Sequence, residues 1–360
     1  MRLLCVGDLA LVNEPLSPDA WMPPPGLVPG EDMRVLFNWE LPIGNTVNPV
    51  PRSSGRRLLA HPSSLGVIRN WAPGFAALAT NHCLDAGPQG LANTIDSLDR
   101  AGFGTVGAGR TREEMTRPLI WETAEGRLAI VNWVFEETHP DWLCVPGPNC
   151  WPGIDEAKST IQNLKRGAEW VLIVVHWSDE LFPYPRPEDR ILARGLAHMG
   201  ADVVVGHHPH VVRGMETFGT CPVYYSVGNF YFSNVPDGKG GWISRSAPRN
   251  REALGIEISL QRGRQPECRS MSFWQKRREV IVDPLRRAAR RMAAVSRPLA
   301  RHEDSAYVDW YMTLRKRFDW LDYRWHFGLW KMGRGGLRRN LLKFFSHLSG
   351  TRLPGHKPAR

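Results

Sequence analysis

Long apolar runs are missing from this sequence of 360 residues, and so is any segment that resembles a cleavable leader. The longest strongly apolar run covers residues 171–175, whereas a helix needs about 20 apolar residues to cross a bilayer. The N-terminal segment MRLLCVGDLAL reaches Asp8 after a few apolar residues and offers no small-residue cleavage site. We therefore expect neither a transmembrane helix nor a signal peptide, and we interpret residues 3–6 as the first strand of the fold.

Closely spaced cysteines are also missing. The six cysteines are scattered, and none forms a C-x-x-C motif, which argues against a zinc ribbon and against a redox motif. We expect free thiols and a reducing, cytoplasmic location, with a disulfide between Cys144 and Cys150 as the alternative.

The number of basic residues exceeds the number of acidic residues only in the C-terminal quarter of the chain. The whole chain has 46 Lys and Arg against 36 Asp and Glu, a formal net charge of +10. Residues 283–360 contain 18 basic and 6 acidic residues and carry +12, whereas residues 1–282 carry −2. A hydrophobic fraction of 42% with 23% charged residues excludes wholesale disorder. The sequence predicts two parts: a domain over residues 1–262, and a basic, Trp-rich, amphipathic helical extension over residues 263–360.

Short apolar runs alternate with helical patterns through the first of these parts. Alternating strands and helices predict an α/β fold, in which ligands gather at the carboxyl ends of the strands. The predicted strands cover residues 3–6, 35–37, 75–79, 128–134, 171–176, 203–206, 223–227 and 254–260, and the predicted helices cover residues 90–101, 155–167 and 186–199.

The extension contains an Arg-rich helix predicted at residues 282–294, which Ser296 and Pro298 should end, and a longer helix from about residue 303. Its apolar stripe either docks on the α/β domain or lies on an anionic membrane surface. Nucleic acid is not an expected partner, because no nucleic-acid-binding motif accompanies the basic charge. The stripe consists of Trp310, Leu314, Phe318, Leu321, Trp325 and Leu329.

Clusters of polar residues follow several predicted strands. Because strand ends in an α/β sheet converge on one rim, we expect the clusters to form one site. Asp, Glu, Asn and His supply ligands suited to Mn, Fe or Zn in a binuclear centre. The clusters are Gly7-Asp8; Asn38-Trp39-Glu40; Thr80-Asn81-His82 with Asp85; His176-Trp177 with Glu180; and Gly206-His207-His208-Pro209-His210 followed by Ser226-Val227-Gly228-Asn229.

In order and content, these clusters resemble those of the CapA-type capsule-synthesis family, which is associated with poly-γ-glutamate. The resemblance rests on the segments GDLAL, NWELPIG, ATNHCLDAGPQG, VVHWSDE, GADVVVGHHPHVV and PVYYSVGNFYFS, between about residue 3 and residue 260. It implies a fold similar to the calcineurin-like metallophosphoesterases. That fold is a four-layered αββα sandwich whose strand-end loops hold two divalent metal ions.

The resemblance also implies a set of metal ligands. One ligand of the phosphoesterase pattern is missing, because Leu9 and Ala10 follow the first aspartate where a D-x-H motif is usual. The sequence does not choose which two of His207, His208 and His210 face a metal. The implied ligands are Asp8, Glu40, Asn81, His82, His176, His208 and His210.

Acid–base roles fall to further polar residues of the same motifs. A histidine with an ordinary pKa near 6.5 suits protonation of a leaving group, and Asp85 is placed to orient His82. Hydrogen bonds that only stiffen the rim are an equal alternative for Asp85 and Asn229. The expected catalytic residues are His82, Asp85, Glu180 and His207, and the expected substrate contacts are Asn38, Trp177, Ser226 and Asn229.

Glu180 has several interpretations: a metal ligand, a general base, a group that binds an amine, or a solvated loop residue. Two neighbours depart from the family pattern. Ser178 stands where glycine is usual, and Leu181 stands where an aromatic residue is usual. We expect these departures to alter substrate contacts near His176.

The sequence as a whole predicts a CapA-like protein that acts in the synthesis or export of a capsule or a poly-γ-glutamate-type polymer. We expect it in the cytoplasm, peripherally attached to the inner face of the membrane through residues 283–360, with an anionic polymer or a phosphoester as substrate. Two alternatives are a free-standing metal-dependent hydrolase of phosphoesters or amides, and a non-catalytic membrane-associated scaffold that binds polymer. Whether the chain is an enzyme, and its oligomeric state, stay open at this point.

Overall fold

The computed structural model describes residues 1–12, 30, 32–44, 57–138, 145–236, 242–244, 248–276 and 279–326. The chain divides into two compact units, Met1–Glu303 and Asp304–Arg360. Cys144, which the disulfide alternative requires, and Leu329, the last residue of the predicted stripe, lie outside the described residues. The described cysteines, including Cys150, are free thiols.

One sheet of the first unit is built around the N-terminal strand β1 (Arg2–Ala10). β1 pairs in parallel with β2 (Met33–Trp39), and the parallel pairing continues through β3 (Gly74–Ala77) to β4 (Phe103–Val106). On its other side, β1 pairs antiparallel with β16 (Glu252–Ser259). The remaining strands of this sheet are β17 (Glu267–Lys276), β18 (Glu279–Val282) and β13 (Asn229–Phe232), the last in parallel with β1.

The second sheet is parallel at its centre. β9 (Trp170–His176) lies between β7 (Gly126–Val134) and β10 (Val203–His207), and β12 (Cys221–Tyr224) extends the parallel set beyond β10. Because these strands point the same way, their carboxyl ends meet at one edge of the sheet. The antiparallel edge strands are β6 (Leu119–Thr123) and β11 (Met215–Phe218).

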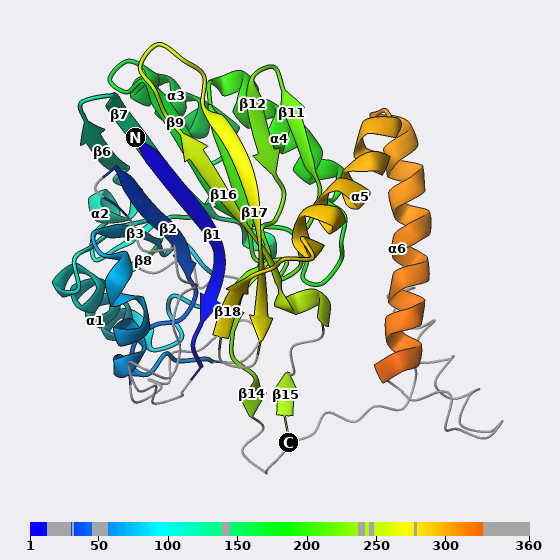
Figure 1. The fold of residues 1–360 in the computed structure, drawn as a ribbon, viewed down its shortest axis with the longest axis horizontal. Coiled ribbons are helices and arrows are strands. Elements are labelled where there is room, and N and C mark those ends of the chain that lie inside the picture. Colours follow the sequence, from blue (N-terminus) through cyan, green and yellow to red (C-terminus); the bar gives the residue numbers. More distant parts are fainter. Residues whose placement is uncertain are drawn as a thin grey trace. The chain divides into compact units, whose positions relative to one another are not determined.

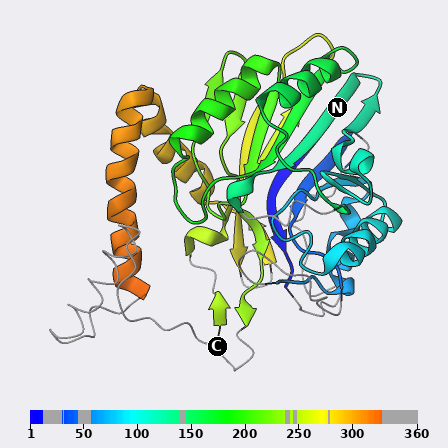
Figure 2. The same ribbon diagram turned by 180° about the vertical axis from the view of Figure 1, so that it is seen from behind.

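Helices cover the outer faces of the two sheets and complete the predicted four-layered αββα sandwich (Figure 1). α1 (Gly87–Arg100) packs over the first sheet, and α3 (Ile154–Lys165) and α4 (Pro187–Met199), in green, cover the second sheet (Figure 2). The shorter elements of this unit are η1 (Pro62–Trp71), β5 (Ala108–Gly109), α2 (Arg112–Thr116), η2 (Glu136–Thr138), β8 (Gly147–Pro148), β14 (Val235–Pro236), β15 (Trp242–Ser244) and η3 (Pro248–Arg251).

Successive side chains of β1 enter two different hydrophobic cores. Leu3 and Cys5 lie in the core between the two sheets, together with Val174 of β9. Leu4 and Val6 lie in the core beneath α1 and η1. Because side chains alternate along a strand, a strand buried on both faces is apolar at every position, and this explains why β1 was predictable as a continuous apolar run.

All the predicted strands and helices of the α/β domain are present, with ends shifted by a few residues. The prediction of a helical extension over residues 263–360 is wrong for its first part, because β17 and β18 extend the first sheet. β17 reads ECRSMSFWQK, in which polar and apolar residues are mixed without regular alternation and without an apolar run. A strand that has neither pattern resembles a loop in sequence.

Helix α5 (Arg287–Arg301) belongs to the first unit and packs against β11, β16 and β17. Its expected end at Ser296 and Pro298 is wrong, since the helix continues to Arg301. Buried Leu299 and a hydrogen bond from Met215 N to Ser296 Oγ at 2.8 Å hold the last turn against the sandwich. These contacts outweigh the single helical hydrogen bond that a proline near a helix end removes. The predicted apolar stripe begins at Trp310, beyond α5, so its docking on the α/β domain stays a prediction.

The described part of the second unit is one helix, α6 (Asp304–His326), at the place where the longer helix is expected. Within the described residues, no helix combines the length and the apolar character that crossing a membrane requires.

Candidate metal centre

Three polar side chains at the strand ends of the first sheet are completely buried. Asp8 lies in β1, Asn38 lies in β2, and Glu40 directly follows β2; each is 0% exposed. Asn38 Nδ2 donates hydrogen bonds to Asp8 Oδ1 at 3.0 Å and to Glu40 Oε1 at 3.4 Å. Asn38 therefore holds the two carboxylates together. This geometry favours a positioning role for Asn38 over the predicted contact with substrate.

Imidazoles from the second sheet face these carboxylates. His207 is the last residue of β10, and its Nδ1 lies 2.8 Å from Asp8 Oδ1. His210 Nδ1 lies 3.3 Å from Asp8 Oδ2 and 4.0 Å from Glu40 Oε1. Asp8 and His207 are 199 residues apart in the chain. They meet because the carboxyl ends of the parallel strands in both sheets lie at the same rim.

The loops that follow β9 and β10 contain four non-glycine residues in the left-handed backbone region. Their φ angles are 72° for Ser178, 62° for Leu181, 91° for His208 and 56° for His210. Each such residue costs on the order of 1–3 kcal/mol, and the surrounding contacts must compensate for it. Within the described residues of the first unit, this strain is concentrated at the loops that carry the predicted ligands, apart from one residue at the start of α5.

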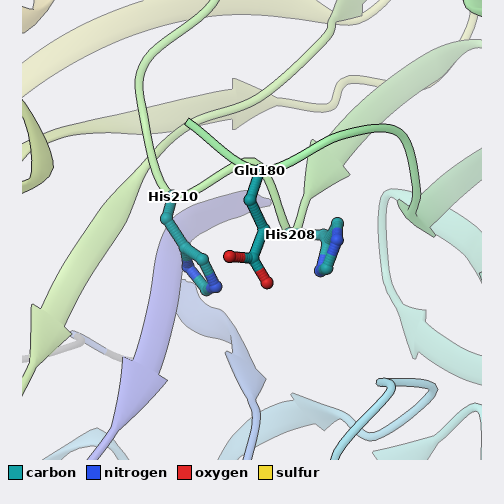
Figure 3. A group of neighbouring side chains, drawn as sticks. All are labelled: Glu180, His208 and His210. Atoms are coloured by element: carbon teal, nitrogen blue, oxygen red, sulfur yellow. The ribbon is translucent and has the colours of Figure 1, made fainter. Parts of the chain in front are cut away.

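Two groups of side chains have ligand atoms that all lie within 4.8 Å of one another. One group contains Asp8, Glu40 and His210, and the other contains Glu180, His208 and His210. The Glu180 carboxylate lies between the imidazoles of His208 and His210 (Figure 3). His210 is common to both groups, so the two groups adjoin each other.

The same geometry distinguishes the three neighbouring histidines of the GHHPH motif. His208 and His210 are members of the two groups, whereas His207 is in neither of them and is instead a hydrogen-bond partner of Asp8. Among the described residues, His208 and His210 are therefore the two histidines of this motif that belong to groups of possible ligands. The arrangement gives His207 the place of a residue that orients the first carboxylate.

Four buried carboxylate and imidazole atoms of this cluster have no hydrogen-bond partner in the protein. They are Asp8 Oδ2, Glu40 Oε2, His176 Nδ1 and His208 Nδ1. Leaving a buried polar atom unsatisfied costs about 1–3 kcal/mol. Carboxylate oxygens and imidazole nitrogens are also the ligand types that suit Mn, Fe and Zn. The residues present therefore fit a divalent metal ion.

The motif after β3 contributes a further pair of contacts. Asn81 Oδ1 lies 3.0 Å from His176 Nε2, and His82 Nδ1 lies 2.7 Å from Asp85 Oδ2. Asp85 Oδ2 also accepts a hydrogen bond from Leu58 N at 2.7 Å. Asp85 thus makes both the predicted contact with His82 and a contact that stiffens the rim. Of the predicted histidine ligands, His82 and His176 belong to neither of the two groups of possible ligands found among the described residues.

Burial and neighbouring histidines act in opposite directions on the carboxylates. Burial alone would raise the pKa of Asp8, but the hydrogen bond with His207 and the positive charge of His207 and His210 outweigh it and hold this pKa well below its ordinary value. Burial raises the pKa of Glu40 to about 8, although His210 opposes the shift. Burial would lower the pKa of His210, yet the charges of Glu40 and Asp8 raise it to about 10. Without metal, a protonated His210 pairs with the ionised Asp8.

The other two central imidazoles behave differently. Burial lowers the pKa of His176 and of His208 well below the ordinary value, and neighbouring imidazoles add to the effect. Both rings are therefore neutral near pH 7. A neutral imidazole has the lone pair that metal coordination requires.

The remaining predicted substrate contacts are buried among other protein groups. Trp177 is 0% exposed and donates from Nε1 to Tyr225 O at 3.0 Å. Ser226 is 1% exposed, and its Oγ accepts a hydrogen bond from Gly228 N at 3.3 Å. Asn229 Oδ1 lies 2.8 Å from His210 Nδ1. These contacts favour supporting roles for all three side chains.

Sequence reasoning missed two buried polar residues behind the rim. Asn132, inside the apolar run of β7, accepts a hydrogen bond from Ala79 N at 2.7 Å and so supports the segment after β3. Arg213 follows the HPH motif by three residues, and its side chain is 0% exposed. A lone polar residue within an apolar run was the available signal for both.

Comparisons with known proteins agree with these motifs. The PGA biosynthesis protein CapA of Bacillus subtilis (strain 168) is 26% identical over 233 residues, which is 63% of this chain and 58% of that protein. The capsule biosynthesis protein CapA of Bacillus anthracis is 29% identical over 193 residues, 51% of this chain and 43% of that protein. This chain therefore spans about half the length of the curated relatives that it matches.

Solved structures show more distant likeness. A hypothetical protein from Thermus thermophilus aligns with 77% of this chain and 100% of that chain, at a TM-score of 0.45 and 15% identity. A novel phosphatase from Mycoplasma pneumoniae aligns with 81% of this chain and 96% of that chain, at a TM-score of 0.45 and 10% identity.

The family described as "Bacterial capsule synthesis protein PGA_cap" matches residues 27–234. That range contains Glu40 after β2, the NHCLD segment, the HWSDE segment and the GHHPH motif, whose side chains the fold gathers at one rim. The chain belongs to the bacterial capsule synthesis protein family.

Proposed function

We propose that this chain acts in the synthesis or export of a capsule or a poly-γ-glutamate-type polymer, and that its strand-end site binds divalent metal ions. The unsatisfied atoms on Asp8, Glu40, His176 and His208 carry the metal part of the proposal. They come from both sheets, and a bound divalent ion would give them partners. The names of the Bacillus relatives support the polymer part.

A bound divalent ion would polarise a carbonyl or phosphoryl oxygen of the substrate. The residues of the chain do the rest. Asp8, Glu40 and His210 form one ligand group, and Glu180 with His208 extends it toward solvent, where Glu180 is exposed.

His82 has the geometry of a residue that moves a proton. Asp85 accepts a hydrogen bond from Nδ1–H of His82, and the lone pair of the neutral ring therefore lies on Nε2. The side chain of His82 is 13% exposed, so it borders the open side of the rim, whereas that of Asp85 is 1% exposed.

A direct experiment separates the proposed polymer role from the two alternatives. The purified 360-residue chain, dialysed with Mn²⁺, is assayed for bound metal and incubated with poly-γ-glutamate and with a phosphodiester. We expect metal in the wild-type protein, loss of metal in His208→Ala, and polymer binding with metal-dependent release of new amino termini. Polymer binding without cleavage would favour the scaffold, and cleavage of the phosphodiester alone would favour the free-standing hydrolase.

We further propose that residues 304–360 hold the protein at an anionic membrane surface. Residues 304–360 contain 12 Lys and Arg against 4 Asp and Glu, a net charge of +8. A truncation to test this should begin at residue 304, because α5 is packed into the sandwich and Glu252 binds Arg291 within the first unit. In a flotation assay with phosphatidylglycerol vesicles, the 360-residue chain should float with the vesicles and the truncated protein should not. Equal flotation of the two proteins would contradict the proposal.

A further inference from the structure

Arg213 is a buried charge that lies close to the metal centre and has no part in the ligand groups. It lies between β10 and β11, in the same segment as His208 and His210, and its side chain is 0% exposed. A buried guanidinium is retained only when its donors find acceptors, because desolvation of the charge is costly. The positions of those acceptors therefore indicate what Arg213 is for.

Three side-chain hydrogen bonds of Arg213 go to the neighbouring loop after β9. Nε donates to Phe182 O at 2.9 Å, Nη2 donates to Asp179 O at 2.7 Å, and Nη1 donates to Ser178 Oγ at 2.5 Å. The acceptors bracket Glu180 in sequence. One guanidinium thus holds both ends of the short segment that presents the Glu180 carboxylate.

Two further contacts join the same parts. Ser178 Oγ donates to Asp189 Oδ2 at 2.5 Å, and Asp189 Oδ2 lies 3.7 Å from Arg213 Nη1. Leu181 N donates to Pro209 O at 2.8 Å, and this bond connects the Glu180 loop with the residue between His208 and His210. The two loops are therefore linked on both sides of the ligand group.

The backbone of the held segment requires such support. Ser178 and Leu181 have φ angles of 72° and 62°, a conformation that non-glycine residues avoid. Glu180, between them, is exposed and has no burial of its own to fix its position. Its place between the two imidazoles consequently depends on contacts made by its neighbours (Figure 3).

We propose that Arg213 is a positioning residue of the metal centre, which sets the Glu180 carboxylate against His208 and His210 by holding residues 178–182. The proposal rests on the metal site proposed above. It makes the Glu180 carboxylate a metal ligand and not a solvated loop residue.

The test is a double-mutant cycle on Mn²⁺ affinity, measured by calorimetry on the full chain. Arg213→Met should weaken Mn²⁺ binding about 10- to 100-fold, the usual effect of removing a group that orients a ligand, and Glu180→Gln, which removes the ligand itself, should weaken it at least as much. The double variant should bind no more weakly than the weaker single variant, since both remove the same ligand. Arg213→Lys keeps the positive charge but cannot make the three hydrogen bonds of the planar guanidinium, and it should weaken Mn²⁺ binding as well.

Arg190→Gln is the matched control, because Arg190 is also a buried arginine but bonds to Glu216 instead of the Glu180 loop. It should lower the melting temperature without changing Mn²⁺ affinity. Two results would overturn the inference. One is an unchanged Mn²⁺ affinity in Arg213→Met and in Arg213→Lys while Glu180→Gln binds Mn²⁺ weakly. The other is a double variant whose fold-loss of Mn²⁺ affinity equals the product of the losses in Arg213→Met and Glu180→Gln. If the calorimetric titration of the wild-type protein shows no Mn²⁺ binding, the proposed metal site itself is wrong, and this outcome is distinct from the two above.

Discussion

Glu40→Gln should separate metal binding from the stability of the metal-free protein. Glu40 is 0% exposed, and its Oε2 has no protein partner. Burial raises the pKa of this carboxyl to about 8, so at pH 7 the metal-free protein holds it mostly in the neutral form, which glutamine imitates. A carboxyl whose pKa is raised by folding destabilises the native state as the pH rises from its ordinary pKa toward 8. Removing the carboxyl should therefore not lower the melting temperature of the chelated protein at pH 7.

Metal binding should show the opposite dependence. A ligand at one hundred times its Kd stabilises the native state by about 2.7 kcal/mol. At about 2.1 cal/mol/K per residue, the 303 residues of Met1–Glu303 have an unfolding entropy of about 0.6 kcal/mol/K. Saturating Mn²⁺ should thus raise the melting temperature of the wild-type protein by about 4 °C. Glu40→Gln should lose most of this rise.

Scanning calorimetry at pH 7, with chelator and then with excess Mn²⁺, measures both quantities on the same samples. Glu122→Gln is the control, because the side chain of Glu122 is 64% exposed on β6. It should keep the full metal-dependent rise. A full rise in Glu40→Gln would show that the ion binds elsewhere, and a large loss of stability in chelated Glu40→Gln would show that the carboxyl is ionised in the metal-free protein.

Three further predictions concern the scaffold. Arg190→Ala should cost about 3 kcal/mol in urea unfolding, because the carboxylate of Glu216, whose side chain is 13% exposed, loses its charged partner and keeps the hydrogen bond from Tyr225 Oη. Gly7→Ala should destabilise the protein by about 3 kcal/mol or more, seen as a lowered melting temperature by circular dichroism, since the new Cβ would lie 2.0 Å from Gly228 O. Burial raises the pKa of Cys221 to about 12, so iodoacetamide at pH 8 should modify this thiol only in denatured protein, as mass spectrometry would show.

The strands of the two sheets differed in how far the sequence could predict them. β9 and β10 are buried at every position, so they appear as continuous apolar runs that a period of two would not reveal. β17 mixes polar and apolar residues along its length and was missed, although it pairs on both sides, with β16 and with β18. The difference is physical: a fully buried parallel strand is specified by its own apolar residues, whereas an antiparallel strand of mixed composition is specified by the neighbours with which it pairs.

The candidate site was predictable as a set of residues but not as an arrangement. Asp8, Glu40, His208 and His210 were expected because they follow strands whose ends share a rim. The choice among the three histidines depended on the backbone after β10, where φ becomes positive at His208 and again at His210. A positive φ at a non-glycine residue is stabilised by tertiary contacts, so no local pattern announces it.

Ser178 shows how one departure from the family pattern is accommodated. The resemblance predicts glycine at this position, and the φ of 72° explains why glycine suits it. Serine is strained in this backbone conformation, but it adds a hydroxyl that glycine lacks. This hydroxyl forms hydrogen bonds with both Arg213 and Asp189. The expected consequence of the departure was altered contact with substrate. That expectation stays a prediction, and the structure adds a compensation: the side chain that stands in the strained conformation also joins the buried network that contacts the loop containing Glu180.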